Sequence, residues 1–224
     1  MERGTVVLLH GLARSAAEMR ILEWRLAARG YRVSNIDYSS RVARIEDASD
    51  AVFAQLDERL SHSSPVHFVT HSLGGLVLRC LLARHEIASA GRAVMLAPPN
   101  RGSELADRLR SLGLFARLLG PLAAQLGTRP EDLPQRLPSP TIPFGVVAGS
   151  RWLNPAGPFW LEGAHDGTVS VASTRLEGMS DHLVLPFTHT FIMNRSEVAR
   201  QVDAFLQAGR FAHPDADSAR SPSR

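Results

Sequence analysis

A serine, a leucine and two glycines stand in a row where a predicted strand gives way to a predicted helix. A serine in such a tight turn is pushed out at the carboxyl edge of a sheet, where its hydroxyl can act as a nucleophile. The crowded turn needs small residues two positions away on either side; Gly74 meets this requirement and Thr70 departs from it. The alternative is a serine that only caps the helix. The segment reads Val69-Thr70-His71-Ser72-Leu73-Gly74-Gly75.

A second short motif, His10-Gly11-Leu12, directly follows the first predicted strand. In an α/β sheet with a serine turn of this kind, the loop after that strand supplies one backbone N–H to an oxyanion hole, and the residue after the nucleophile supplies the other. The predicted donors are therefore the amides of Leu12 and Leu73, with Gly11 allowing close approach of the backbone. A simple strand-to-helix turn is the alternative.

A serine nucleophile needs a base, and the base needs an acid to orient it. The expected chain order is serine, acid, histidine. Asp166 precedes Gly167 in a predicted turn, and His189 lies between the last predicted strand and the final helix. A turn-forming aspartate and a surface histidine are the alternatives. Asp181 and Glu162 are the other candidate acids, and they are less well placed than Asp166. His182 is the other candidate base, but it lies at the start of a predicted strand, on the wrong edge of the sheet.

These residue types predict acyl chemistry without a metal or a cofactor. His189 would take the proton from Ser72 as the hydroxyl attacks an acyl carbon, and Asp166 would stabilise the imidazolium. The two backbone amides would bind the oxyanion, each contributing on the order of 3 kcal/mol. A zinc site is not predicted, because the other closely spaced histidines fall on a turn, on a strand and at the end of that strand, and so do not share one face of an element. These histidines are His62, His67 and His71.

The elements that must position these residues alternate between strands and helices. Apolar runs without strict alternation, separated by amphipathic helices, indicate a doubly wound α/β domain with six mostly parallel strands covered on both faces. Ser15 with Glu18, and Asn194 with Glu197, have the spacing of helix N-terminal caps. The predicted strands are 5–9, 32–36, 66–70, 93–96, 142–148 and 182–185, and the predicted helices begin near 19, 45, 73 and 194.

Two segments interrupt this alternation. An insertion over about residues 102–140 carries Leu114, Phe115, Leu118 and Leu119 before a proline-rich run. It is interpreted either as a lid or as helices that cover the core. Residues 212–224 are rich in Ser, Asp, Arg and Pro, which predicts a disordered tail. The predicted domain is therefore 1–211.

Composition excludes several classes of protein. The chain has 224 residues, one cysteine and no lysine, which excludes a disulfide framework, a Schiff-base lysine and a P-loop. Its formal net charge is +3, and arginines and acids are interspersed, so nucleic-acid binding is not expected. No apolar run reaches the roughly 20 residues of a membrane span, and no secretory signal is visible, which predicts a cytoplasmic protein.

The ordered set of motifs resembles the α/β-hydrolase superfamily, in particular its small bacterial lipase and esterase branch. The matching residues are His10-Gly11-Leu12, Thr70 to Gly75, Asp166-Gly167 and His189. The likeness runs from about Gly4 to Gly209. It implies a carboxylic-ester hydrolase with a lid over an acyl pocket, in a minimal version of the fold that lacks the first two strands of larger members.

Several functions stay open from the sequence alone. The leading hypothesis is hydrolysis of acyl esters, lipids included. Acyl transfer, thioester hydrolysis and a non-catalytic binding protein of the same fold are the alternatives. Transient contact of the lid with a lipid surface is compatible with the leading hypothesis. The oligomeric state and the alcohol of the substrate are not determined.

Overall fold

A six-stranded sheet forms the centre of the molecule in a computed structural model of the chain, and all of its strands are parallel. The strand order is β2-β1-β3-β4-β5-β6. The structure describes residues 3–42, 44–59, 65–87, 89–111, 119–152 and 161–213. The strands are β1 (Thr5–Leu9), β2 (Arg32–Ile36), β3 (Val66–His71), β4 (Ala90–Leu96), β5 (Phe144–Gly149) and β6 (Asp181–Leu185).

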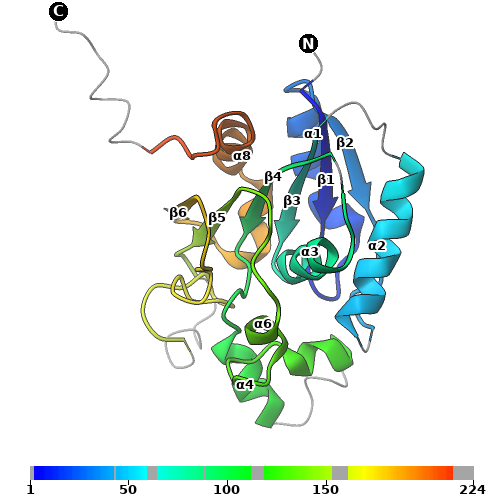
Figure 1. Cartoon of the computed structure of the whole chain (residues 1–224). Helices are drawn as coiled ribbons and strands as arrows, with labels where there is room; N and C mark the ends of the chain where they lie inside the picture. The colour runs from blue at the N-terminus through cyan, green and yellow to red at the C-terminus, as the bar shows by residue number, and fades with distance from the viewer. Residues whose placement is uncertain are drawn as a thin grey trace, which may run out of the picture.

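Helices cover both faces of the sheet (Figure 1). The two faces follow from the side-chain alternation of a strand: Val7 and Leu9 of β1 pack against α2 and α3, whereas Val6 and Leu8 pack against α1 and α8. Both sets are fully buried, which explains the continuous apolar runs in the sequence. The helices are α1 (Arg20–Ala27), α2 (Ile45–Arg59), α3 (Leu73–Arg84) and α8 (Ser196–Ala208).

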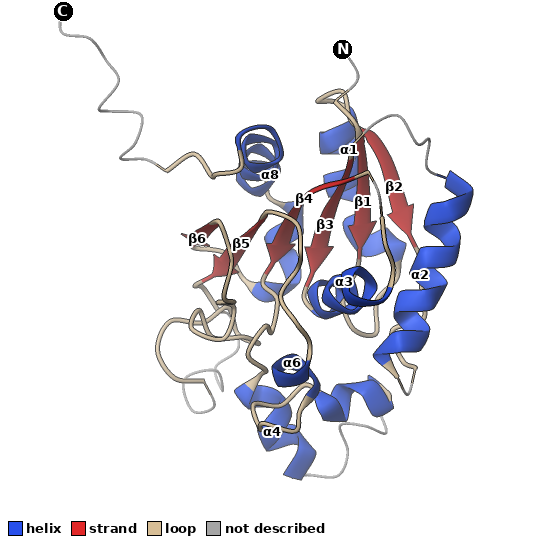
Figure 2. Ribbon diagram, in the orientation of Figure 1, coloured by secondary structure: helices blue, strands red, loops and turns tan. Residues whose placement is uncertain are grey.

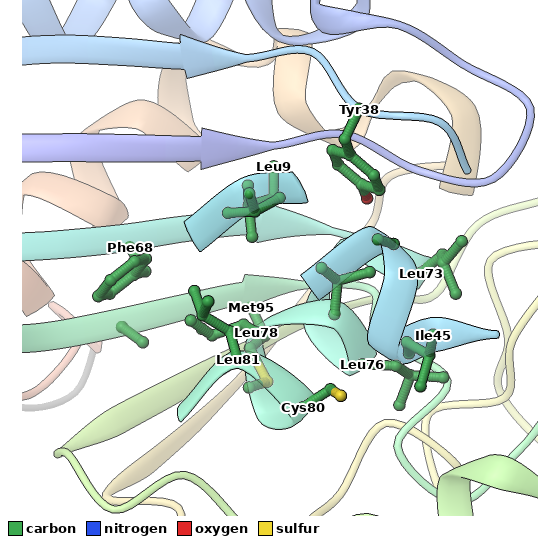
Figure 3. Packing of buried hydrophobic residues seen from close by; sticks show 14 of the residues in the cluster. Leu9, Tyr38, Ile45, Phe68, Leu73, Leu76, Leu78, Cys80, Leu81 and Met95 are labelled. Carbon is green, nitrogen blue, oxygen red and sulfur yellow. The ribbon is translucent and has the colours of Figure 1, made fainter. Parts of the chain in front are cut away.

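The core beneath α3 holds the serine turn in place. Figure 3 shows part of this cluster, in which Leu9 and Phe68 of the sheet lie with Leu76 of α3 and Ile45 of α2. Each of these side chains is at most 2% exposed. At roughly 1.5–3 kcal/mol for each large apolar side chain, their burial fixes the start of α3 firmly on the sheet.

The insertion between β4 and β5 lies at the carboxyl ends of the strands. Figure 2 shows the arrowheads of β1, β2 and β3 pointing toward its helices. They are α4 (Glu104–Ser111), the 3-10 helix η2 (Pro121–Gln125) and α6 (Leu133–Arg136). Leu114, Phe115 and Leu118 lie outside the described residues, and so do residues 214–224 of the predicted tail 212–224. None of the helices in the described ranges has the length and apolarity to cross a membrane.

The two predicted helix caps differ from the structure in different ways. Ser15 is the N-cap residue of the 3-10 helix η1 (Ala16–Met19), but its side chain makes no cap hydrogen bond, and the Glu18 carboxylate accepts the amide of Gly11. Asn194 ends another 3-10 helix, η3 (His189–Asn194), so Arg195 is the residue that precedes α8. In both places a 3-10 turn stands between the loop and the α-helix.

Candidate active site

The serine turn has a strained backbone. Ser72 has φ 52° and ψ −120°, a conformation that costs a residue other than glycine on the order of 1–3 kcal/mol. Its amide donates to the carbonyl of Leu96 at the end of β4 (2.9 Å), which anchors the turn to the neighbouring strand. A Cβ atom on Gly74 would lie 2.6 Å from the carbonyl oxygen of Leu9, so this position must be glycine for α3 to approach β1.

Thr70 does not prevent this turn. Its side chain is fully buried, and a Cβ atom on Gly75 would lie 3.5 Å from Thr70 Oγ1 and 3.0 Å from the Cβ of Pro98. The contact with Thr70 would be an ordinary van der Waals contact, and the tight contact would be with Pro98. Ser72 thus adopts its positive φ with Thr70 two residues before it.

Three residues that are distant in the chain meet at the carboxyl edge of the sheet. His189 Nε2 lies 3.0 Å from the hydroxyl of Ser72, and His189 Nδ1 lies 2.7 Å from Asp166 Oδ2. His189 is 9% exposed and Asp166 is 2% exposed. An acid, an imidazole and a hydroxyl in this sequence of hydrogen bonds can transfer the hydroxyl proton to the imidazole while the acid balances the new charge.

Asp166 both forms its turn and faces the histidine. Its Oδ1 accepts the amides of Thr168 (2.9 Å) and Val169 (2.8 Å), while Oδ2 is turned to His189. The backbone carbonyl of Asp166 also accepts the amide of His189 (3.0 Å). The turn-forming alternative considered from the sequence is therefore true alongside the predicted contact, and the turn fixes the direction of the carboxylate.

The competing residues lie elsewhere. Asp181 begins β6 and accepts the amide of Phe211 (2.8 Å), and His182 contacts the hydroxyl of Thr174 (2.9 Å). Both are at the amino end of their strand, the edge opposite to Ser72. Glu162 is exposed.

The two predicted oxyanion donors and His10 have different surroundings in the structure. Leu12 lines the cavity in front of Ser72. His10 is fully buried, stacks on Tyr38 with 4.2 Å between ring centroids, and its Nδ1 donates to the carbonyl of Gly11 (2.9 Å). Leu73 packs its side chain in the core, and its amide is the first of α3, where a helix offers no internal acceptor.

A cavity of about 310 Å³ opens onto Ser72 and His189. This volume is at the lower end of the range of small-molecule sites. Most of its lining surface is apolar, and the insertion contributes the majority of the apolar residues. The apolar lining residues are Leu12, Pro99, Leu105, Ala106, Leu109, Leu119, Leu126 and Val169.

The sequence did not predict Glu18 as a residue of the site, but the structure places it beside Ser72. The side chain of Glu18 lines the cavity, accepts the amide of Gly11 (2.8 Å) and lies 3.2 Å from Nδ1 of His71. Its spacing from Ser15 suggested a helix cap instead. Only the distance between Glu18 and His71 reveals its place, and 53 residues separate the two in the chain.

Comparison with known proteins assigns the chain to a family. The model of the alpha/beta hydrolase family matches residues 6–219. No curated protein matches the chain. Among solved structures, the mature lipase BlEst2 of Bacillus licheniformis is similar, with a TM-score of 0.74 and 20% identity over 92% of this chain and 91% of that one.

Two further solved structures share the fold. The esterase RhEst1 of a Rhodococcus species has a TM-score of 0.59 and 18% identity, over 92% of this chain and 90% of its own. The metagenomic carboxyl esterase MGS0156 has a TM-score of 0.65 and 19% identity, over 86% of this chain and 66% of its own. With the family match over nearly the whole length, the chain belongs to the alpha/beta hydrolase family.

Proposed function

We propose that this protein hydrolyses carboxylic esters through an acyl-enzyme on Ser72. The observation that carries the proposal is the continuous set of hydrogen bonds from Asp166 through His189 to the serine hydroxyl, 2.7 Å and 3.0 Å long. The lipase and esterase names of the structural neighbours are consistent with it. No metal or cofactor takes part in the proposed reaction.

The reaction proceeds in two halves. His189 Nε2 accepts the Ser72 proton as Oγ forms a bond to the acyl carbon, and Asp166 balances the imidazolium charge. The amides of Leu12 and Leu73 bind the oxyanion of the tetrahedral intermediate. His189 then returns the proton to the leaving alkoxide as the ester C–O bond breaks. In the second half His189 activates a water that releases the acyl group.

The cavity indicates the substrate class. Its apolar wall, which includes Leu105, Leu109 and Leu126, suits the hydrocarbon chain of an acyl group, lipid acyl groups included. The contact of Leu114, Phe115, Leu118 and Leu119 with a lipid surface stays a prediction; of these, Leu119 lines the cavity. Turnover of p-nitrophenyl esters from acetate to palmitate, each with and without an alcohol or thiol acceptor, would separate hydrolysis from acyl transfer and give the preferred chain length.

Replacing the nucleophile tests the function. We expect Ser72→Ala to lower kcat for a p-nitrophenyl ester by at least about a thousandfold, because no acyl-enzyme can form. Ser139→Ala is the matched control, because the Ser139 hydroxyl bonds the carbonyl of Glu177 on an exposed surface. Equal turnover in the wild type and Ser72→Ala would refute the proposal and would favour a binding protein with the same fold.

A further inference from the structure

Two buried ionisable side chains beside Ser72 have no part in the proposed reaction. The Glu18 side chain is 8% exposed and the His71 side chain is 3% exposed, with Oε2 and Nδ1 3.2 Å apart. Burying a carboxylate or an imidazolium costs free energy unless the charge is paired and hydrogen bonded. A pair at this depth, next to the nucleophile, calls for an explanation beyond packing.

The pair joins the two loops that flank the serine. On one side, Glu18 Oε2 accepts the amide of Gly11, the residue before the predicted oxyanion donor Leu12 (2.8 Å). On the other side, His71 Nε2 lies 3.1 Å from the backbone carbonyl of His189. The two imidazole rings are 4.9 Å apart between centroids. A displacement of either loop would therefore be transmitted through this pair.

The contacts also bear on the protonation of the pair. Both ring nitrogens of His71 face acceptors, yet a neutral imidazole has only one N–H. Both contacts are satisfied only if Nε2–H donates to the His189 carbonyl and a further proton lies between Nδ1 and Glu18 Oε2. Burial by itself would raise the pKa of Glu18, but the bonds from His71 and Gly11 and the nearby Arg14 hold it below its ordinary value. Burial lowers the pKa of His71, and the hydrogen bond to Glu18 opposes that shift. The case for the second proton therefore rests on the two contacts of the ring.

We propose that Glu18 and His71 act as a positioning pair, which shares one proton and holds the oxyanion loop and the His189 loop in register with Ser72. Neither residue touches the reacting atoms in this account, which rests on the proposed ester hydrolysis. Because an error of about 1 Å in the placement of reacting groups can cost on the order of a hundredfold in rate, the pair should affect kcat more than KM.

The variant Glu18→Gln isolates the shared proton. A glutamine oxygen still accepts the Gly11 amide, but a neutral amide cannot stabilise a second proton on His71, so one ring contact is lost. We expect kcat for a p-nitrophenyl ester to fall roughly tenfold to hundredfold with KM within about threefold. Glu23→Gln is the matched control, because Glu23 bonds Asn35 (2.8 Å) and not the site. An unchanged kcat in Glu18→Gln would overturn the inference.

NMR spectroscopy of the full chain tests the protonation of the Glu18–His71 pair independently of enzyme activity. In ¹⁵N-histidine-labelled protein, with His71 assigned through His71→Gln, we expect Nε2 of His71 to carry a proton and its Nδ1 signal to shift in Glu18→Gln. A bare Nε2 in the wild type would overturn the pairing even if ester hydrolysis were established. If the wild-type protein shows these His71 signals but does not turn over any ester, the proposed hydrolysis is refuted and the pairing is not.

Discussion

At the scale of single residues, the carboxylate of Asp166 has two separable tasks. Oδ1 holds the turn through two backbone amides, and Oδ2 faces His189. An asparagine in its place could keep the first task with its oxygen. Its amide nitrogen would then face His189 Nδ1 and favour the wrong tautomer of the ring.

Asp166→Asn should therefore separate catalysis from folding. We expect kcat to fall about a thousandfold to ten-thousandfold, with the unfolding midpoint in urea close to that of the wild type. Asp181→Asn and Glu162→Gln, the other two candidate acids, are the controls and should retain turnover. A modest loss in Asp166→Asn that is matched by Asp181→Asn would mean that Asp166 serves only its turn.

Local sequence patterns predicted three residues that the structure brings into hydrogen-bond contact. Ser72, Asp166 and His189 each follow a strand, and the order of the motifs was enough to select them as candidates. Glu18 has an equally clear local pattern, that of a helix cap, but Gly11 and His71 compete for its carboxylate. A local pattern cannot report such a competition.

At the scale of the elements, a buried arginine attaches the insertion to helix α3. Arg79 is 2% exposed on α3, and its guanidinium donates to the carbonyls of Asn100 (3.1 Å), Pro134 (3.0 Å) and Pro138 (3.0 Å), and to that of Leu137. Burial lowers the pKa of Arg79 to about 10, so the side chain remains a cation at neutral pH. The insertion thus depends on a side chain of the central helix.

Replacing this arginine should loosen the insertion. We expect Arg79→Met to lower the free energy of unfolding by about 3–5 kcal/mol, because several buried carbonyls lose their donor. Arg84→Met, on the same helix, removes an exposed pair with Asp50 and should leave the urea midpoint nearly unchanged. Equal midpoints for the two variants would show that Arg79 contributes little.

The positions of the helices and strands were predictable where apolar periodicity is strong. The stripe Ile45, Ala48, Val52 and Leu56 is buried as expected, and so are Leu22 and Leu26. The ends were less predictable. Pro143 lies just before β5, so the strand begins at Phe144 and not at Ile142. The 3-10 turns before α1 and α8 displaced the caps, because a short turn leaves no periodic signal.

At the scale of the whole molecule, strand order brings the site together. The central position of β3 places Ser72 beside β1 on one side and β4 on the other, while β5 and β6 carry the loops of Asp166 and His189. Alternation of strands and helices predicted a parallel sheet, but the order of the strands is set by long-range pairing. The resemblance to a known family supplied what periodicity alone could not.

Stability of the whole molecule should depend on pH through the half-buried His182. Burial lowers the pKa of His182 to about 4, against an ordinary value of 6.5. Between these values the unfolded chain binds a proton that the folded chain does not, so stability is greatest above about pH 6.5 and falls as the pH drops toward 4. We expect the urea midpoint to fall between pH 7 and pH 5, and to fall less in His182→Gln. The same decrease in both proteins would contradict this.

The most direct test of the account is labelling of the folded protein with a fluorophosphonate, followed by peptide mapping. A serine activated by a histidine attacks the phosphorus and displaces fluoride, and an ordinary serine does not. The account predicts one adduct, on the peptide that contains Ser72, and labelling at least about a hundredfold slower in His189→Gln. Folded wild-type protein that stays unlabelled, or that labels at the same rate without the imidazole of His189, would contradict it.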